Sequence, residues 1–110
     1  MPRILFICAQ NKLRSPTAET IFSRFDQLDC LSAGIYQSAN NPLDRELVEW
    51  ADVIFTMEKK HKAKIQQRFR SSLNGKRIIS LDIPDEFQYM EPALIELLEK
   101  RVQVHLQKFL

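Results

Sequence analysis

The sequence CAQNKLRSP, residues 8–16, connects a short apolar segment to an amphipathic one. The segment before it, residues 4–7, is apolar and branched, and it is short enough to be a buried strand. In the segment after it, residues 16–25, apolar residues recur at spacings of three and four, which is typical of one helix face. We therefore predict a strand, a loop and a helix, with Ser15 as the helix cap and Pro16 as the first helical residue.

A loop that leads into a helix N-terminus is suited to binding an anion. Its backbone N–H groups have no partners within the helix, and the helix dipole adds partial positive charge, so phosphate is the typical ligand. Arg14 would add a planar guanidinium group that binds two oxygens of one phosphate. The residues expected to surround the phosphate are Ala9, Gln10, Asn11, Lys12, Leu13, Arg14 and Ser15.

Cys8 lies at the predicted carboxyl end of the first strand, where open α/β sheets bind their ligands. A cysteine near a helix N-terminus and an arginine becomes a thiolate more easily, and the thiolate is the nucleophilic form. We therefore expect Cys8 and Arg14 to be catalytic. The alternative is that Cys8 is a small core residue and Arg14 a solvated cation. The strand, loop and helix context favours the catalytic interpretation.

The loop resembles that of the low-molecular-weight protein tyrosine phosphatases, in which a cysteine and five residues precede Arg-Ser-Pro. The matching residues are Cys8, Asn11, Arg14, Ser15 and Pro16. Weaker similarities follow at residues 32–34 and 51–57, and the chain looks like a shortened, divergent bacterial-type member. The resemblance implies a phosphomonoester hydrolase that acts through a cysteinyl-phosphate intermediate, without a metal or any other cofactor.

The same resemblance implies roles for three more residues. Ser15 would hydrogen-bond the sulfur of Cys8, and Asn11 would brace the loop from within. Tyr36 corresponds roughly to a wall of the family's substrate cleft, where it would stack on a substrate ring; an ordinary, partly buried tyrosine is an equal alternative. Phosphotyrosine in a protein is the substrate that the family suggests, and other phosphomonoesters remain open.

Two positions depart from the family's loop. Gln10 stands where the family usually has glycine, so a left-handed backbone there would be costly and the loop would be shaped or strained differently. Leu13 replaces a cysteine that many members carry. Cys8 therefore has no adjacent thiol for a protective disulfide after oxidation.

A carboxylic acid is needed near the nucleophile to protonate the departing oxygen. Asp82 and Asp85 follow the predicted strand at residues 77–81, so both should lie at the same sheet edge as Cys8. The family places an Asp-Pro pair and then an aromatic residue in this loop. Asp85 matches that aspartate best, with Glu86 in place of the proline, and Asp82 is the competitor. A third alternative is that both aspartates only solvate or cap a turn.

The rest of the chain alternates predicted strands and helices. Further strands are expected near residues 28–33 and 53–55, and a last helix over residues 92–109. This order predicts an α/β, three-layer sandwich with a four-stranded parallel sheet and helices on both faces. With 110 residues, we expect a single phosphatase-like domain over residues 1–110.

Composition excludes several classes of protein. The apolar fraction of 45% and the charged fraction of 27% are ordinary for a globular protein. No apolar run reaches the ~20 residues of a membrane span, and no signal-peptide pattern opens the chain, so we expect a cytoplasmic protein without a membrane partner. Cys30 is interpreted as a buried free thiol, with a disulfide to Cys8 as the alternative. The two cysteines and two histidines do not suggest a metal site.

Charge is uneven although the net charge is only +2. Basic residues concentrate between Lys59 and Arg77, and acidic ones between Asp82 and Glu99. A basic face would steer a phosphorylated substrate or a nucleic acid toward the pocket, but a solvated helix face is the more favoured interpretation. The sequence does not determine the oligomeric state.

Two rival functions use the same loop. The first is arsenate reduction, for which an external thiol would be needed because only Cys30 is available as a second cysteine. The second is a phosphate- or RNA-binding module without catalysis, which Gln10, the missing proline and the basic segment would favour. A nucleotide-binding domain lacks support, because the sequence contains neither a dinucleotide fingerprint nor a Walker loop.

Overall fold

Four parallel strands form one sheet in the computed structural model, which describes residues 1–108. The strands are β1 (Arg3–Cys8), β2 (Asp29–Gly34), β3 (Val53–Thr56) and β4 (Arg77–Ser80). Their order in the sheet is β2-β1-β3-β4, so the chain moves outward from β1 in both directions. The predicted four-stranded parallel sheet is confirmed.

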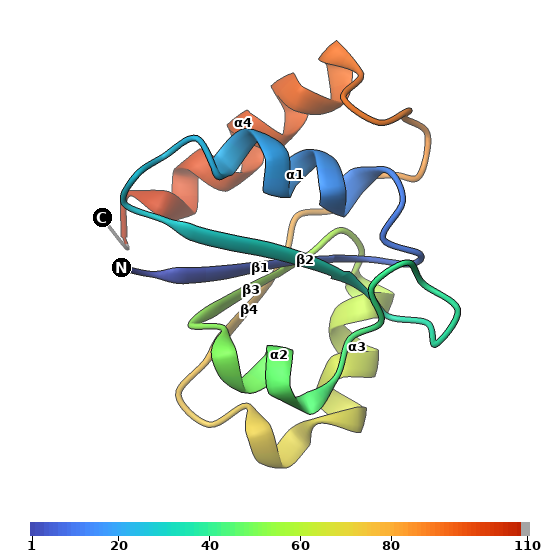
Figure 1. Ribbon diagram of the computed structural model, residues 1–110, viewed down its shortest axis with the longest axis vertical. Coiled ribbons are helices and arrows are strands. Elements are labelled where there is room, and N and C mark those ends of the chain that lie inside the picture. The colour runs from blue at the N-terminus through green and yellow to red at the C-terminus, as the bar shows by residue number, and fades with distance from the viewer. Residues whose placement is uncertain (109–110) are drawn as a thin grey trace.

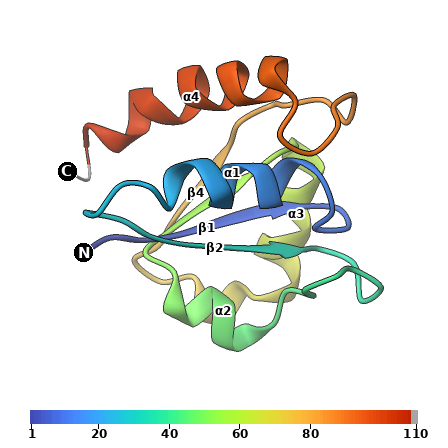
Figure 2. The same ribbon diagram turned by 45° about the horizontal axis from the view of Figure 1, so that its top comes forward.

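The helices lie on both faces of this sheet. They are α1 (Arg14–Phe22), α2 (Arg45–Trp50), α3 (Lys59–Arg68), a short 3₁₀ turn η1 (Arg70–Ser72) and α4 (Pro92–Leu106). Figures 1 and 2 show α1 and α4 together on one face and α2 and α3 on the other. The three layers agree with the predicted sandwich. Phe109, part of the predicted last helix, lies outside the described residues.

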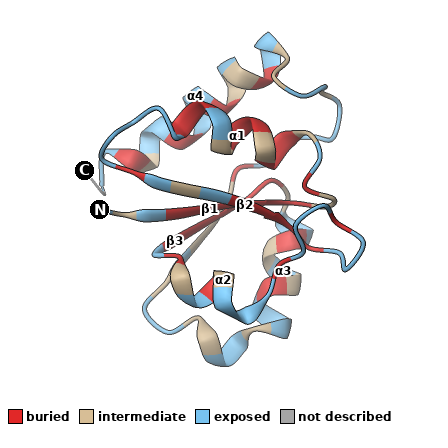
Figure 3. Cartoon of the chain, in the orientation of Figure 1, coloured by how far each residue is buried: buried red, intermediate tan, exposed pale blue. Residues whose placement is uncertain are grey.

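β1 runs through the centre of the molecule and separates two hydrophobic clusters. Ile4 and Phe6 belong to the cluster under α1 and α4, whereas Leu5 and Ile7 belong to the cluster over α2 and α3. All four side chains are completely buried, as Figure 3 shows by the red centre of the sheet. Successive residues of a strand face opposite sides, so a continuous apolar run is what a strand covered on both faces requires.

The predicted limits of the first helix are wrong at both ends. Its N-cap is Leu13 rather than Ser15, which lies inside the first turn with its hydroxyl beside the sulfur of Cys8. The helix ends at Phe22, and Phe25 lies beyond it, 45% exposed. The segment after Phe22 carries polar and charged residues that cannot continue the apolar face.

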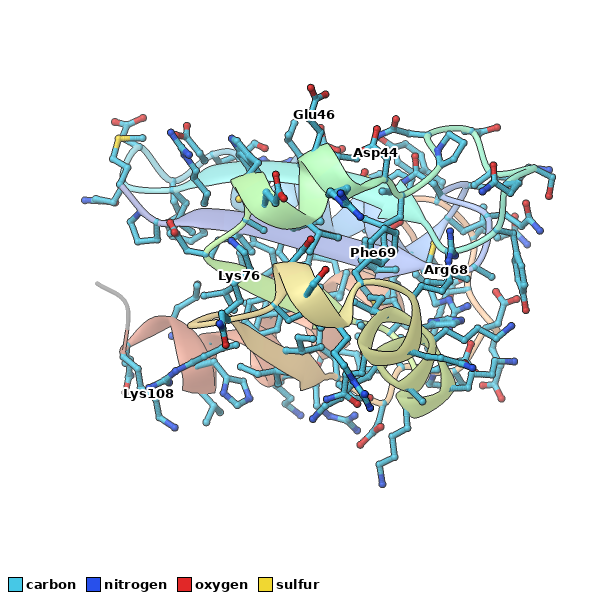
Figure 4. All side chains as sticks on the ribbon, turned by 90° about the horizontal axis from the view of Figure 1, so that it is seen from below. Asp44, Glu46, Arg68, Phe69, Lys76 and Lys108 are labelled. Atoms are coloured by element: carbon cyan, nitrogen blue, oxygen red, sulfur yellow. The ribbon has the colours of Figure 1, made fainter. Side chains whose placement is uncertain are left out.

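Lys76 and Asp44 stabilise the two ends of the short helix α2. The Asp44 carboxylate accepts a hydrogen bond from the Leu47 amide, which caps the N-terminus. The Lys76 ammonium donates to the carbonyls of Glu49 and Ala51 at the other end. Figure 4 shows Asp44 and Lys76 near opposite ends of this helix.

Among the described residues, no helix is both long and apolar enough to span a bilayer.

The strand register brings four loops to one edge of the sheet. Cys8 pairs with Gly34, while Ile7 pairs with Thr56 and Thr56 with Ser80. Because the strands are parallel, the segments that follow them all leave from this carboxyl edge, seen at the right of Figure 1.

Candidate active site

Cys8 is the last residue of β1 and lines a cavity at the carboxyl edge of the sheet. The cavity has a volume of about 170 Å³ and is lined by Cys8, Ala9, Gln10, Lys12, Leu13, Arg14 and Asp85. Cys8 is only 3% exposed, and its sulfur lies 2.9 Å from the hydroxyl oxygen of Ser15. The sulfur is therefore positioned at the cavity with a hydroxyl group beside it.

A chain of buried polar side chains fixes the loop behind Cys8. Asn11 Nδ2 donates to the hydroxyl oxygens of Ser15 and Ser32, at 2.9 Å each. Ser32 in turn donates to Glu19 Oε1 at 2.6 Å. Every buried polar group here has a partner, so the network holds the loop in one shape. Asn11 and Ser15 thus contact the groups that the sequence prediction assigned to them, and their catalytic roles stay predictions.

The strain expected at Gln10 falls on Asn11 instead. Asn11 has φ 56°, whereas Gln10 is not among the residues with positive φ. Asparagine tolerates the left-handed region better than most residues, and its side-chain hydrogen bonds hold it there. The backbone carbonyl of Gln10 accepts a hydrogen bond from the Asn40 amide, and its side-chain oxygen accepts one from the Ser38 hydroxyl. Gln10 therefore avoids the left-handed backbone that would be costly for it, and Asn11 adopts that conformation instead.

Arg14 is almost entirely buried, with 2% of its side chain exposed. Its Nη1 donates to Glu58 Oε2 and to the carbonyl of Ile83, both at 2.8 Å. Its Nε lies 3.7 Å from Asp85 Oδ1. The guanidinium plane is thus fixed from behind, and Nη2 has no partner within residues 1–108. An anion in the cavity would find a charged donor already oriented.

Glu58 is a site residue that the sequence analysis missed. It immediately precedes α3 at the same sheet edge, and its carboxylate balances the buried charge of Arg14. Burial alone would raise the pKa of Glu58, but its hydrogen bond to Arg14 and the charges of Arg14, His61 and Lys60 lower it overall. Its position two residues after the buried strand β3 was the signal that could have identified it, by the reasoning applied to Asp82 and Asp85.

Asp85, and not Asp82, lies at the cavity of Cys8. Asp85 lines that cavity and is 64% exposed, so its carboxyl is at the mouth rather than in the interior. The Asp82 carboxylate instead accepts a hydrogen bond from the hydroxyl of Ser80, at 2.8 Å, and its backbone has φ 55°. The geometry therefore separates the two candidates for the general acid.

The loop that carries Asp85 is held at several points, although Glu86 stands where the family has a proline after the aspartate. Arg101 donates from α4 to the carbonyls of Leu81 and Asp82, at 2.6 and 3.0 Å. The backbone amide of Ile83 donates to the carbonyl of Met57, and the carbonyl of Ile83 accepts from Nη1 of Arg14. These contacts replace part of the rigidity that a proline would supply.

Tyr36 lies outside the residues that line the cavity. Its backbone amide donates to the carbonyl of Ala9 at 3.3 Å, but its side chain is 37% exposed. The Lys64 ammonium lies 4.7 Å from the centre of its ring and 3.5 Å from its hydroxyl. The structure thus places Tyr36 beside the loop without directing its ring to Cys8.

Cys30, the second cysteine, is a free thiol like Cys8. Burial, followed by the charges of Glu19 and Asp29, raises the pKa of Cys30 to about 12. Such a thiol is a poor nucleophile near neutral pH. Within the described part of the chain, no cluster of three or more histidine, cysteine or carboxylate side chains is arranged to hold a metal ion.

His61 is completely buried beside the site, and neither ring nitrogen has a hydrogen-bond partner among the residues that the structure describes. Its Nε2 lies 3.8 Å from Glu58 Oε2. Burial lowers the pKa of His61 to about 4; Glu58 opposes this shift, and the charges of Arg14, Lys60 and Lys64 reinforce it. His61 is therefore neutral in the folded protein near pH 7.

This buried histidine predicts acid destabilisation. Between the unfolded pKa of 6.5 and the folded value of about 4, the unfolded chain binds the extra proton. Stability is thus lost as pH falls through this range, and we expect the free energy of unfolding to drop by about 2 kcal/mol between roughly pH 7 and pH 5. Urea unfolding of the wild type and of His61→Leu at both pH values measures this drop in the free energy of unfolding. An equal drop in both proteins would contradict the assignment.

Comparison with known proteins gives one family and a consistent fold. Residues 3–51 match the model of the family described as low molecular weight phosphotyrosine protein phosphatase. The protein-arginine-phosphatase of Bacillus subtilis (strain 168) is 30% identical over 93 residues, covering 60% of this chain and 62% of that protein. The match thus spans less than two thirds of the relative's length.

Solved structures of similar proteins share the fold at lower identity. Wzb of Vibrio vulnificus, in complex with benzylphosphonate, is 22% identical with a TM-score of 0.77, covering 97% of this chain and 98% of its own. The tyrosine phosphatase Wzb of Escherichia coli K30, in complex with phosphate, is 21% identical with a TM-score of 0.76 and 96% coverage of both chains. The YwlE arginine phosphatase of Geobacillus stearothermophilus is 21% identical with a TM-score of 0.70, covering 98% and 94%.

Proposed function

We propose that this chain is a cysteine-dependent phosphomonoester hydrolase of the low-molecular-weight phosphotyrosine protein phosphatase family, whose model matches residues 3–51. The observation that carries the proposal is the arrangement around one cavity of a cysteine sulfur, a buried guanidinium group and an exposed carboxyl group, from Cys8, Arg14 and Asp85. Displacement at phosphorus needs each of these groups. Cys8 ends β1, Arg14 begins α1 and Asp85 lies in the loop after β4, all at the same sheet edge.

In the first step, the thiolate of Cys8 attacks phosphorus in line with the departing ester oxygen. The S–P bond forms, the P–O bond to the leaving group breaks, and protonated Asp85 gives its proton to that oxygen. Arg14 and the loop amides bind the equatorial oxygens, and they supply the positive charge that the transition state needs. Ser15 donates a hydrogen bond to the sulfur and favours its anionic form.

In the second step, water hydrolyses the cysteinyl-phosphate. Asp85, now a carboxylate, accepts the proton of the attacking water, the new P–O bond forms, and the S–P bond breaks to restore the thiolate. Asn11 keeps the loop in shape through both steps by its contacts with Ser15 and Ser32. Glu58 holds the Arg14 guanidinium in the orientation that the phosphate requires.

The substrate that we propose is a phosphorylated one, either phosphotyrosine in a protein or another phosphomonoester. The similar proteins include both tyrosine and arginine phosphatases by name. Tyr36 lies beside the loop but not in the cavity, so stacking on a phosphotyrosine ring would require its side chain to turn away from Lys64. We further propose one domain over residues 1–110, acting in the cytoplasm, where Cys8 stays reduced.

Hydrolysis of p-nitrophenyl phosphate between about pH 5 and pH 7, with a chelator present, tests the proposed function. Turnover that vanadate inhibits is the expected result. Reduction of arsenate by the protein with an external thiol, without phosphatase turnover, would favour the reductase. Binding of phosphate without either reaction would favour a binding module.

A further inference from the structure

Lys12 is an exposed cation at the mouth of the Cys8 cavity, and no residue in the range 1–108 pairs with it. Lys12 is one of the residues that line the cavity, with Gln10, Leu13 and Asp85, and it is exposed. It takes part in no hydrogen bond, ion pair or ring contact. Arg14, the other cation at this site, is fixed by Glu58 and Ile83. Of the two positive charges, Lys12 is therefore the one left free to bind part of a ligand.

The position of Lys12 is unfavourable for a cation in the absence of a ligand. It lies just before Leu13, the N-cap of α1, and α1 has no acidic residue in its first turn. A positive charge near a helix N-terminus costs roughly 0.3–1 kcal/mol, because it faces the positive end of the dipole. The charge of Arg14, two residues on, is balanced by Glu58. An anion at the mouth of the cavity would offset the unfavourable interaction of Lys12 with the helix dipole.

Among residues 1–108, no aromatic residue lines the cavity. The aromatic residues of the neighbouring loops have other contacts: the Tyr36 ring lies under Lys64, the Tyr89 hydroxyl is 3.1 Å from that of Thr20, and Phe87 packs on the core. With a volume of about 170 Å³, the cavity has room for a phosphate group and little more. A leaving group must extend over the mouth, where it meets mainly polar side chains and the Lys12 ammonium.

A second set of basic residues extends the positive edge. Lys59 and Lys60 lie at the start of α3, which also lacks an acidic residue in its first turn. Together with Glu58, Asp82, Ile83 and Pro84 they line an open cleft of about 400 Å³ at the same edge of the sheet. Lys60 is 3.6 Å from Glu58 and is partly neutralised by it. Two carboxylates thus balance these two lysines, and Lys12 remains the cation at this edge that no carboxylate of residues 1–108 pairs with.

We propose that Lys12 is a specificity-determining residue, which selects phosphomonoesters whose leaving group carries a second anionic group. This rests on the proposed function for the site but concerns its substrate class. The Lys12 ammonium binds the second anion, a carboxylate or a further phosphate, while Arg14 and the loop amides bind the phosphate that is cleaved. A neutral aromatic leaving group gains no such contact.

Binding of two unreactive phosphonates tests this inference without relying on turnover. One is 3-carboxybenzylphosphonate, and the other is its neutral, nearly isosteric amide, 3-carbamoylbenzylphosphonate. Titration calorimetry at low salt gives the affinity ratio of the acid to the amide. We expect the wild type to favour the acid and Lys12→Met to lower the ratio about threefold to fivefold. Lys12→Glu lowers it further, because a like charge then faces the carboxylate.

Lys100→Met is the matched control, since it removes an exposed lysine that does not line the cavity. Lys100 belongs to α4, which lies on the same face of the sheet as α1. The ratio is expected to stay at the wild-type value in this control and to approach one as salt rises in the wild type. An unchanged ratio in both Lys12 variants, or binding of neither phosphonate, would overturn the inference. Loss of turnover with an intact, Lys12-dependent ratio would count against the hydrolase alone.

Discussion

Replacement of Cys8 by serine is expected to lower hydrolysis of p-nitrophenyl phosphate by roughly a thousandfold or more, because the reaction loses its nucleophile. A serine hydroxyl at this position is not ionised near neutral pH, and the loop offers no general base to activate it: its neighbours in the cavity are Arg14, Lys12 and amide or apolar groups, with Asp85 at the mouth. Initial rates of nitrophenol release measure the effect.

The same variant should still bind an anion. The Ser15 and Asn11 hydrogen bonds that shape the loop do not require the sulfur, and Arg14 keeps its contacts with Glu58 and Ile83. Phosphate binding by calorimetry therefore separates lost chemistry from lost folding. Cys30→Ser is the matched control: Cys30 lies outside the cavity, so turnover should stay at the wild-type value. Full activity of Cys8→Ser would contradict the mechanism in which Cys8 is the nucleophile.

Asp85→Asn is expected to lower kcat about a hundredfold, whereas Asp82→Asn should change it little. The reason is geometric, since only Asp85 lines the cavity of Cys8, and the Asp82 carboxylate is occupied by Ser80. Both substitutions keep the size of the side chain and remove only its ability to carry and exchange a proton. Steady-state rates for the two variants at one pH give the comparison.

The leaving group makes this prediction sharper. Nitrophenolate departs without a proton, whereas phenolate is a poorer leaving group and needs one. The fall in kcat for Asp85→Asn should thus be larger with phenyl phosphate than with p-nitrophenyl phosphate. A larger loss in Asp82→Asn, or equal losses in Asp85→Asn for both substrates, would remove Asp85 from the role of general acid.

Local patterns were sufficient to predict the sheet and the position of Cys8. The apolar run at residues 4–7 specifies a strand buried on both faces, and strand and helix alternation specifies a parallel sheet. Once β1 is the central strand, the residue that ends it must lie at the carboxyl edge. The same reasoning placed Asp82 and Asp85 at that edge, but it could not choose between them.

What the sequence could not show depends on contacts between distant residues. Ser15 is a good capping residue by type, yet its hydroxyl is used by Cys8 and Asn11, so tertiary contacts override the local preference. Glu58 acts on Arg14 across 44 positions, a pairing that no spacing rule contains. The left-handed residue of the loop is Asn11 rather than Gln10, because only Asn11 has side-chain hydrogen bonds to Ser15 and Ser32 that hold it there.

The central claim is that a phosphoryl group passes through the sulfur of Cys8, and trapping that intermediate tests it most directly. Asp85→Asn with p-nitrophenyl phosphate should accumulate it, since nitrophenolate leaves without a proton while hydrolysis of the thiophosphate ester lacks its base. Rapid mixing should show a burst of nitrophenol close to one equivalent of enzyme. Acid quenching and peptide mass spectrometry should then find one phosphoryl group on the peptide that contains Cys8. Turnover without a burst, or a phosphoryl group on any other residue, would contradict the account.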